Sequence, residues 1–131
     1  MTGLGTVIIL PISFIAFVWF YAQFMNPGHE QAFYRGFANL TGAPFMFCFA
    51  PFTMYIISRW LCDRVGGAFY LHGLLYFISY HVIDFVLIAF TGDMPQFLTV
   101  SYLLIVISKL IGVLLGAYFS SKANRQHSSL I

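Results

Sequence analysis

Two ionisable side chains stand inside long apolar stretches and are the first candidates for chemistry. Asp84 interrupts residues 67–90, and Lys109 interrupts residues 96–119. An isolated charge in the middle of a bilayer costs roughly 3 kcal/mol or more, so such residues usually pair, face protein, or mark a path for protons or ions. On a helix, Tyr80 and His81 precede Asp84 by four and three residues, which places both one turn from the carboxylate.

The sequence allows more than one role for this group. Either it is a buried polar cluster that fixes helix register, or Asp84, His81 and Lys109 form a proton- or ion-responsive coupling site. On antiparallel helices, Asp84 lies about 10 Å and Lys109 about 21 Å below the connector between them. A direct pair is therefore borderline, and a relay through His81, the Tyr80 hydroxyl or water is an equal alternative. A protonated, hydrogen-bonded Asp84 and a lipid-facing charge are the remaining alternatives.

Small residues recur at every fourth position beside Lys109: Ser108, Gly112, Gly116 and Ser120. This extended form of the GxxxG pattern lets two helix backbones approach closely. It predicts a tight helix contact, either within the chain or between protomers. Tyr102 and Lys109 are seven residues apart and share this side of the helix, so the ammonium is expected to face protein.

Residues 40–62 carry a second stripe at spacings of three and four. Its members are Thr41, Pro44, Cys48, Pro51, Tyr55, Ser58 and Cys62. Pro44 and Pro51 each lack a backbone donor and should bend the helix, which neighbouring helices must compensate. The stripe is either a packing seam with a bend or a hinge that lines a cavity.

The elements that position these residues follow from composition. The chain has 131 residues, of which 60% are hydrophobic, 20% aromatic and only 8% charged. A soluble domain has about 25% charged residues, so these values exclude a disordered tail, a nucleic-acid binder and an ordinary cytosolic domain.

Four apolar stretches reach the roughly 20 residues that cross a hydrocarbon core. They are residues 4–24, 40–62, 67–90 and 96–119. We therefore expect an all-α membrane protein, a compact bundle of four transmembrane helices in one domain. Continuous runs such as VIIL and LLIVI lack the alternation of barrel strands. The first stretch has no basic leader or cleavage site and is expected to remain as an anchor.

Orientation follows from Lys and Arg near the connectors, which are residues 25–39, 63–66 and 91–95. Basic residues favour one side: Arg59, Arg64, Lys122 and Arg125, against Arg35 and the acidic Asp93 on the other. We expect both termini and the tail 120–131 in the cytoplasm, and 25–39 as an extracytoplasmic connector. Phe33, Tyr34 and Phe37 in this connector suit either a short interfacial helix or an aromatic belt.

No catalytic, cofactor or metal motif is present in the sequence. His72 and His81 point to opposite sides of one helix, so together they cannot ligate a haem or metal from within this chain. Cys48 and Cys62 are fourteen residues apart on one helix, about 21 Å, which is too far for a disulfide.

Three functional classes remain. The favoured one is a non-catalytic protein that interacts through its helices with another membrane protein or itself, as an accessory subunit, assembly factor, or inhibitor or immunity protein. The alternative is a small, oligomeric proton- or ion-coupled transporter or channel that uses Asp84, His81 and Lys109. A membrane enzyme or cofactor anchor would require a partner chain for its site. The compact loops suit a bacterial inner membrane, and no nucleic-acid partner is expected.

Overall fold

The computed structural model describes residues 2–92 and 99–128, and in this part of the chain every regular element is helical. The helices are α1 (Thr2–Phe20), α2 (Gln31–Val65), α3 (Phe69–Thr91) and α4 (Val100–Ser128), and a π-helical turn, η1 (Tyr21–Met25), extends α1. All four helices are long and apolar enough to cross a membrane. The all-helical class and the four candidate spans are thereby confirmed, as expected of a multi-pass membrane protein.

Helix α2 begins well before the predicted span at residue 40. Its first turn is at Gln31, so most of the predicted connector 25–39 belongs to α2 and is not a separate interfacial helix. Pro27 and Gly28, the latter with φ of +92°, lie just before this start, and no proline interrupts residues 31–43. The linking segment therefore shortens to residues 26–30, because helix-forming residues continue past the point where hydropathy falls.

The other connectors also differ from their predicted bounds. α2 ends in a left-handed cap at Gly66, whose N–H donates to the Cys62 carbonyl at 3.2 Å, and α3 starts at Phe69. α4 continues to Ser128, so the described part of the predicted tail 120–131 is helical. Most of the connector 91–95, with Asp93, and the predicted start of the fourth span at residue 96 lie outside the described residues.

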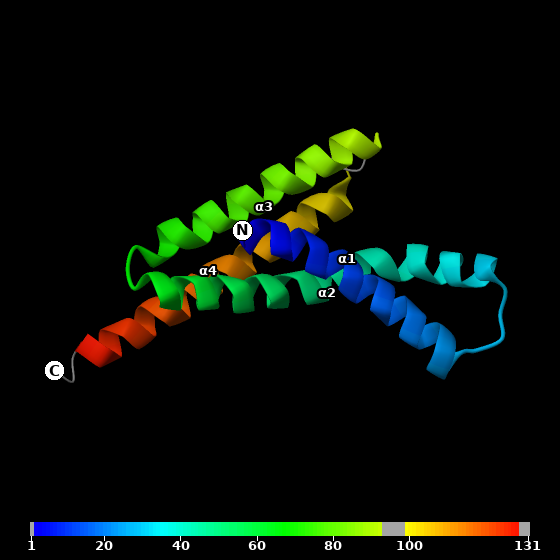
Figure 1. Ribbon diagram of the computed structural model, residues 1–131, viewed down its shortest axis with the longest axis horizontal. Coiled ribbons are helices and arrows are strands. Elements are labelled where there is room, and N and C mark those ends of the chain that lie inside the picture. The colour runs from blue at the N-terminus through cyan, green and yellow to red at the C-terminus, as the bar shows by residue number, and fades with distance from the viewer. Residues whose placement is uncertain (1, 93–98, 129–131) are drawn as a thin grey trace.

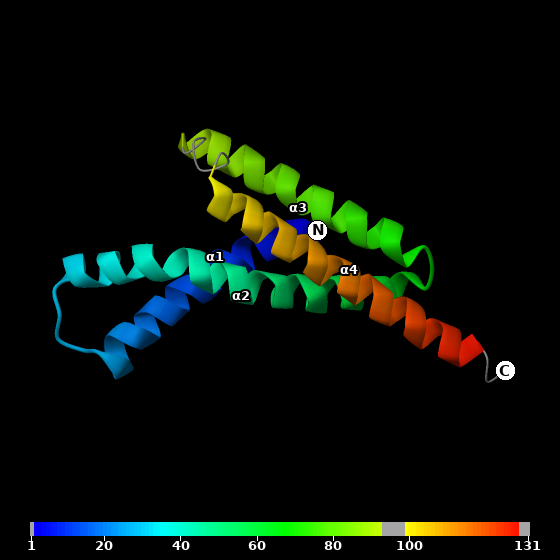
Figure 2. The ribbon, with the colours of Figure 1, turned by 180° about the vertical axis from the view of Figure 1, so that it is seen from behind.

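The helices cross instead of running side by side along their full length. Figures 1 and 2 show α1 and α4 on opposite sides of α2, with α3 above the crossing. Towards η1, α1 diverges from α2, and the last turns of α4 extend beyond α2. The arrangement is thus more open and elongated than the compact bundle that short connectors predict.

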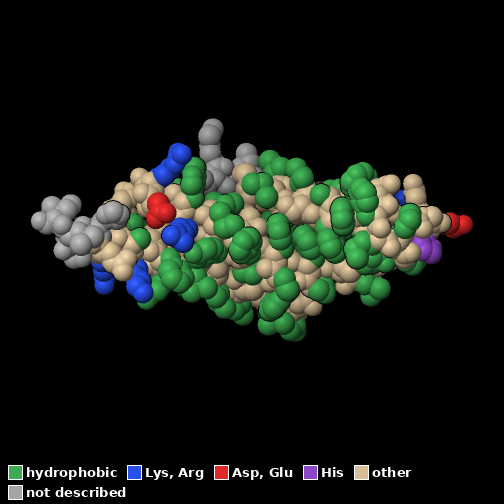
Figure 3. All heavy atoms as spheres, turned by 90° about the horizontal axis from the view of Figure 1, so that it is seen from below, with side chains coloured by type: hydrophobic (Ala, Val, Ile, Leu, Met, Phe, Trp, Pro, Cys, Tyr) green, Lys and Arg blue, Asp and Glu red, His purple; other side chains and the backbone are tan. Residues whose placement is uncertain are grey.

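A small core lies where the four helices meet. It contains Leu10 from α1, Met54 from α2, Tyr76 and Tyr80 from α3, and Val113 from α4. Large apolar side chains cover the middle of the face in Figure 3, whereas most charged side chains lie towards its two ends. An apolar exterior of this kind is expected when lipid replaces water as the solvent.

Candidate functional site

Lys109 lies inside the protein, between α3 and α4. Its side chain is on the face of α4 that contacts the core, and only 5% of the residue is exposed. The ammonium donates a hydrogen bond to the Tyr80 hydroxyl at 2.9 Å and lies 4.5 Å from the centre of the same ring. Tyr80 therefore provides both an oxygen acceptor and a cation–π contact to the charge.

Asp84 has a different partner. The Tyr102 hydroxyl donates to Asp84 Oδ2 at 3.4 Å, a long hydrogen bond between α4 and α3. Asp84 and Lys109, both described, form no ion pair with each other. Each helix therefore supplies one charged group and one tyrosine, and each tyrosine contacts the charged group of the opposite helix. We call Tyr80, His81, Asp84, Tyr102 and Lys109 the polar cluster.

His81 is the member of the cluster without a polar contact. Its Nε2 atom is buried and has no hydrogen-bond partner among the described residues. Its ring instead meets Phe77 and Tyr80 edge-on, with centroid distances of 4.4 Å and 5.0 Å. A relay from Asp84 through His81 to Lys109 is thus not formed in this structure, since the tyrosines hold both charged groups.

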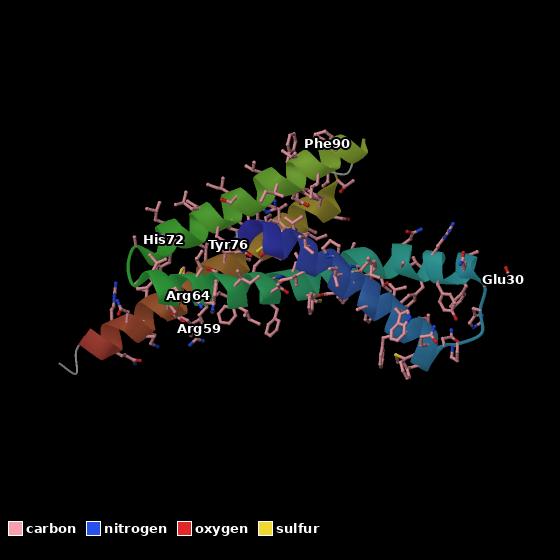
Figure 4. The ribbon with its side chains drawn as sticks, viewed as in Figure 1. Glu30, Arg59, Arg64, His72, Tyr76 and Phe90 are labelled. Atoms are coloured by element: carbon pink, nitrogen blue, oxygen red, sulfur yellow. The ribbon has the colours of Figure 1, made fainter. Side chains whose placement is uncertain are left out.

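Tyr76 extends the polar side of α3 towards α1 and α2. Its hydroxyl lies 2.7 Å from Thr6 Oγ1 and donates to Met54 Sδ at 3.1 Å. Figure 4 shows Tyr76 next to the first turns of α1. Neither Tyr76 nor Thr6 is among the site residues predicted from the sequence. The available signal was the spacing of Tyr76, Tyr80 and Asp84, which are successive fourth residues on one helix face.

The small-residue stripe of α4 packs against α2 of the same chain. A Cβ atom at Gly112 would overlap the Pro51 carbonyl oxygen, and one at Gly116 would lie 2.7 Å from the Tyr55 carbonyl oxygen. The two backbones are therefore in direct contact. Gly112 and Gly116 are covered by α2 of the same chain, so this part of α4 is not available to a partner helix.

Serine hydroxyls add hydrogen bonds at the same seam. Ser58 donates to the Val113 carbonyl at 2.9 Å. Ser120 lies 3.1 Å from the Arg59 carbonyl and 2.5 Å from Asp63 Oδ1. Ser108 differs, because its hydroxyl donates to the Ile105 carbonyl of its own helix at 2.8 Å.

The two prolines of α2 have different surroundings. The helix continues without a break through both, and Pro51 contacts Gly112. Pro44 is exposed and borders an apolar groove of about 370 Å³ between α2 and α4. The groove residues are Ala43, Pro44, Phe47, Cys48, Ser101, Leu104 and Ile105.

Residues of metal-ligating type are dispersed. Within residues 2–92 and 99–128, no three His, Cys, Asp or Glu side chains gather at one place. Cys48 is an exposed thiol in the groove, and Cys62 is a buried thiol that donates to the Phe69 carbonyl at 3.3 Å.

In comparisons with known proteins, no family model, curated protein or solved structure matches this chain. The fold and the polar cluster by themselves define the class, an all-helical protein of multi-pass membrane type with a polar cluster between α3 and α4.

Proposed function

We propose that this chain is a small polytopic membrane protein that acts by helix–helix interaction with another membrane protein, as an accessory subunit, assembly factor, or inhibitor or immunity protein. It sits in a bacterial inner membrane with both termini in the cytoplasm. The observation that supports this function is the open groove between α2 and α4, on the Pro44 side of the contact between Pro51 and Gly112.

The groove has the properties of a helix-packing surface. Its lining is apolar, and Ala43 and Ser101 are small residues from its two helices. In lipid, helices associate through close packing at small residues, because lipid tails leave little hydrophobic gain. A transmembrane helix of a partner that lies along Pro44 and Leu104 makes such contacts with α2 and α4 together.

Cys48 allows this proposal to be tested with the natural chain. A photoreactive apolar maleimide attached to the exposed Cys48 is activated in native membranes, and adducts are identified by mass spectrometry. Buried Cys62 is expected to remain unmodified. We expect an adduct between Cys48 and one integral membrane protein.

The matched control moves the probe to the far face of α4. The double variant Cys48→Ala, Leu103→Cys carries the thiol at an exposed position about 150° from the groove, at 100° per residue. This variant should give lipid adducts alone. If the probe on Cys48 also forms adducts with lipid alone, the proposal is contradicted. A covalent dimer of the chain would show that the groove binds a second copy and not another protein.

A second candidate function is a small, oligomeric proton- or ion-coupled transporter or channel. The observation that favours it is the buried, unpartnered Nε2 of His81 beside the Tyr80–Lys109 and Tyr102–Asp84 hydrogen bonds. Ionisable groups at this depth in a membrane often serve such transport.

Flux through proteoliposomes tests this candidate. If the cluster couples transport, Asp84→Asn should abolish pH-dependent flux, whereas Glu30→Gln, which removes an exposed acid outside the helices, should leave it intact. Flux that is unchanged by Asp84→Asn, or the absence of flux with the natural chain, removes the transporter candidate.

A further inference from the structure

The basic residues of the chain are concentrated at one end. Four of its six Lys and Arg residues lie in the last turns of α2 and α4: Arg59, Arg64, Lys122 and Arg125. Figure 3 shows several of these basic side chains at the same end of the visible face, next to the apolar middle. The end therefore carries the charge that attracts anionic lipid headgroups.

Arg64 differs from its neighbours in how it is held. Its guanidinium lies 4.1 Å from the centre of the Trp60 ring, one turn earlier on α2. No carboxylate of the described residues forms an ion pair with Arg64, whereas Arg59 has Asp63 at 4.0 Å and the Tyr55 hydroxyl at 3.0 Å. Figure 4 shows both arginines on this end of α2. Arg64 is therefore oriented by an aromatic face while its donors stay available.

An apolar groove starts at the same tryptophan. It has a volume of about 270 Å³ and runs between α1 and α2, lined by Gly5, Thr6, Ile9, Ile56, Ile57 and Trp60. Trp60 thus lines the groove, and its ring also contacts Arg64. Arg64 lies four residues further towards the end of α2, about 6 Å along the helix axis.

The first turn of α1 is at the mouth of this groove. α1 begins at Thr2, and Gly5 in its first turn lines the groove together with Trp60. The first N–H groups of a helix have no acceptor within the helix and favour an anion nearby.

We infer that Arg64, Trp60 and the α1–α2 groove form a binding site for one anionic phospholipid. Its phosphate contacts the guanidinium of Arg64 near the start of α1, and one acyl chain lies in the groove along Ile9 and Ile56. Guanidinium groups bind phosphate oxygens through paired N–H donors. The apolar groove directly beneath the cation favours a lipid over a free anion, because only a lipid uses both parts. This inference does not depend on the proposed function.

Trp60 is itself a reporter for the site. The chain has two tryptophans, so Trp19→Phe leaves Trp60 as the single fluorophore. The full chain with this change is reconstituted in phosphatidylcholine vesicles that contain a small fraction of phosphatidylglycerol or phosphatidylcholine, each with a brominated acyl chain. We expect brominated phosphatidylglycerol to quench Trp60 at an about fivefold lower fraction than the brominated zwitterionic lipid, as one basic contact predicts.

Two further variants separate a built site from general surface charge. Arg64→Gln should abolish the preference for phosphatidylglycerol, whereas Lys122→Gln, which removes an exposed charge at the same end, should retain it. Gly5→Leu should reduce quenching by both brominated lipids, because it fills the groove at a position where a Cβ meets no atom within 4 Å.

Equal quenching by the two lipids, or equal loss of preference in Arg64→Gln and Lys122→Gln, assigns any attraction to the diffuse surface potential. If the two brominated lipids quench Trp60 equally, while inorganic phosphate shifts the Trp60 emission and chloride at the same ionic strength does not, the site takes a free anion and not a lipid.

Discussion

At the scale of single residues, the polar cluster offsets the desolvation cost of the two charges, Asp84 and Lys109, by hydrogen bonds to tyrosines and not by a direct ion pair. The Tyr80 hydroxyl accepts a hydrogen bond from the Lys109 ammonium, and the Tyr102 hydroxyl donates one to the carboxyl of Asp84. A hydrogen bond to a charged group contributes about 1.5–3 kcal/mol, and its loss leaves a buried charge poorly solvated. The tyrosine hydroxyls are therefore as important to the cluster as the two ionisable residues.

This view predicts that Tyr80→Phe destabilises the protein by about 1–3 kcal/mol, because the ammonium loses its acceptor while the ring and its cation–π contact remain. Unfolding in mixed micelles of mild detergent and dodecyl sulfate measures the change. Tyr70→Phe is the matched control, since Tyr70 is an exposed tyrosine on the same helix. Lys109→Met should cost less than Tyr80→Phe, because it removes the buried charge itself. Equal stability of the two tyrosine variants would show that Lys109 does not depend on the hydroxyl.

The sequence singles out the members of this cluster and leaves a contact between the Tyr80 hydroxyl and Lys109 open as one alternative, but it does not pair Asp84 with Tyr102. Spacing within one helix places Tyr80 and His81 a turn from Asp84, and favours them as its partners. In the structure Asp84 bonds Tyr102 and Tyr80 bonds Lys109, across two helices. Such pairings depend on the rotation and depth of α3 against α4, which no spacing along a single helix encodes.

At the scale of elements, the main contact is the seam between α2 and α4. The every-fourth pattern from Ser108 to Ser120 predicts a close helix contact, and the structure places Gly112 and Gly116 against the α2 backbone. The partner helix was not predictable, because small residues permit approach to any surface that fits. The start of α2 was also missed, since hydropathy identifies the part of a helix that suits lipid, and residues 31–39 are helical without being strongly apolar.

Gly112→Ala tests the seam. Alanine has the higher helix propensity, by about 1 kcal/mol, so a neutral site would gain stability. At Gly112 the new Cβ would overlap the Pro51 carbonyl, and the helices must separate, at a cost of about 1–3 kcal/mol. Gly36→Ala in the same measurement should be neutral or stabilising, because a Cβ there meets nothing within 4 Å. A stabilised Gly112→Ala protein would contradict the close approach of α2 and α4.

At the scale of the whole molecule, helix length sets the relation to the bilayer. The 35 residues of α2 extend about 52 Å at 1.5 Å per residue, well beyond a hydrocarbon core of about 30 Å. Trp60 and the basic residues near it are expected at one interface, as aromatic and basic side chains usually are. The first turns of α2, with Arg35, then stand in water on the opposite side.

Labelling with a membrane-impermeant maleimide tests this placement. In intact cells Arg35→Cys should react, whereas Asn124→Cys should react only after the membrane is opened, because the two exposed positions lie beyond opposite ends of the apolar region. The unmodified chain is an internal control: Cys48 is expected within the membrane and Cys62 is buried, so neither thiol should react in intact cells. Reaction of Asn124→Cys alone from outside would reverse the proposed orientation. Reaction of both variants from the same side would contradict a span by α2. Ser120 hydrogen-bonds the Arg59 carbonyl, so the end of α4 lies at the end of α2, and one crossing by α2 must separate it from residue 35.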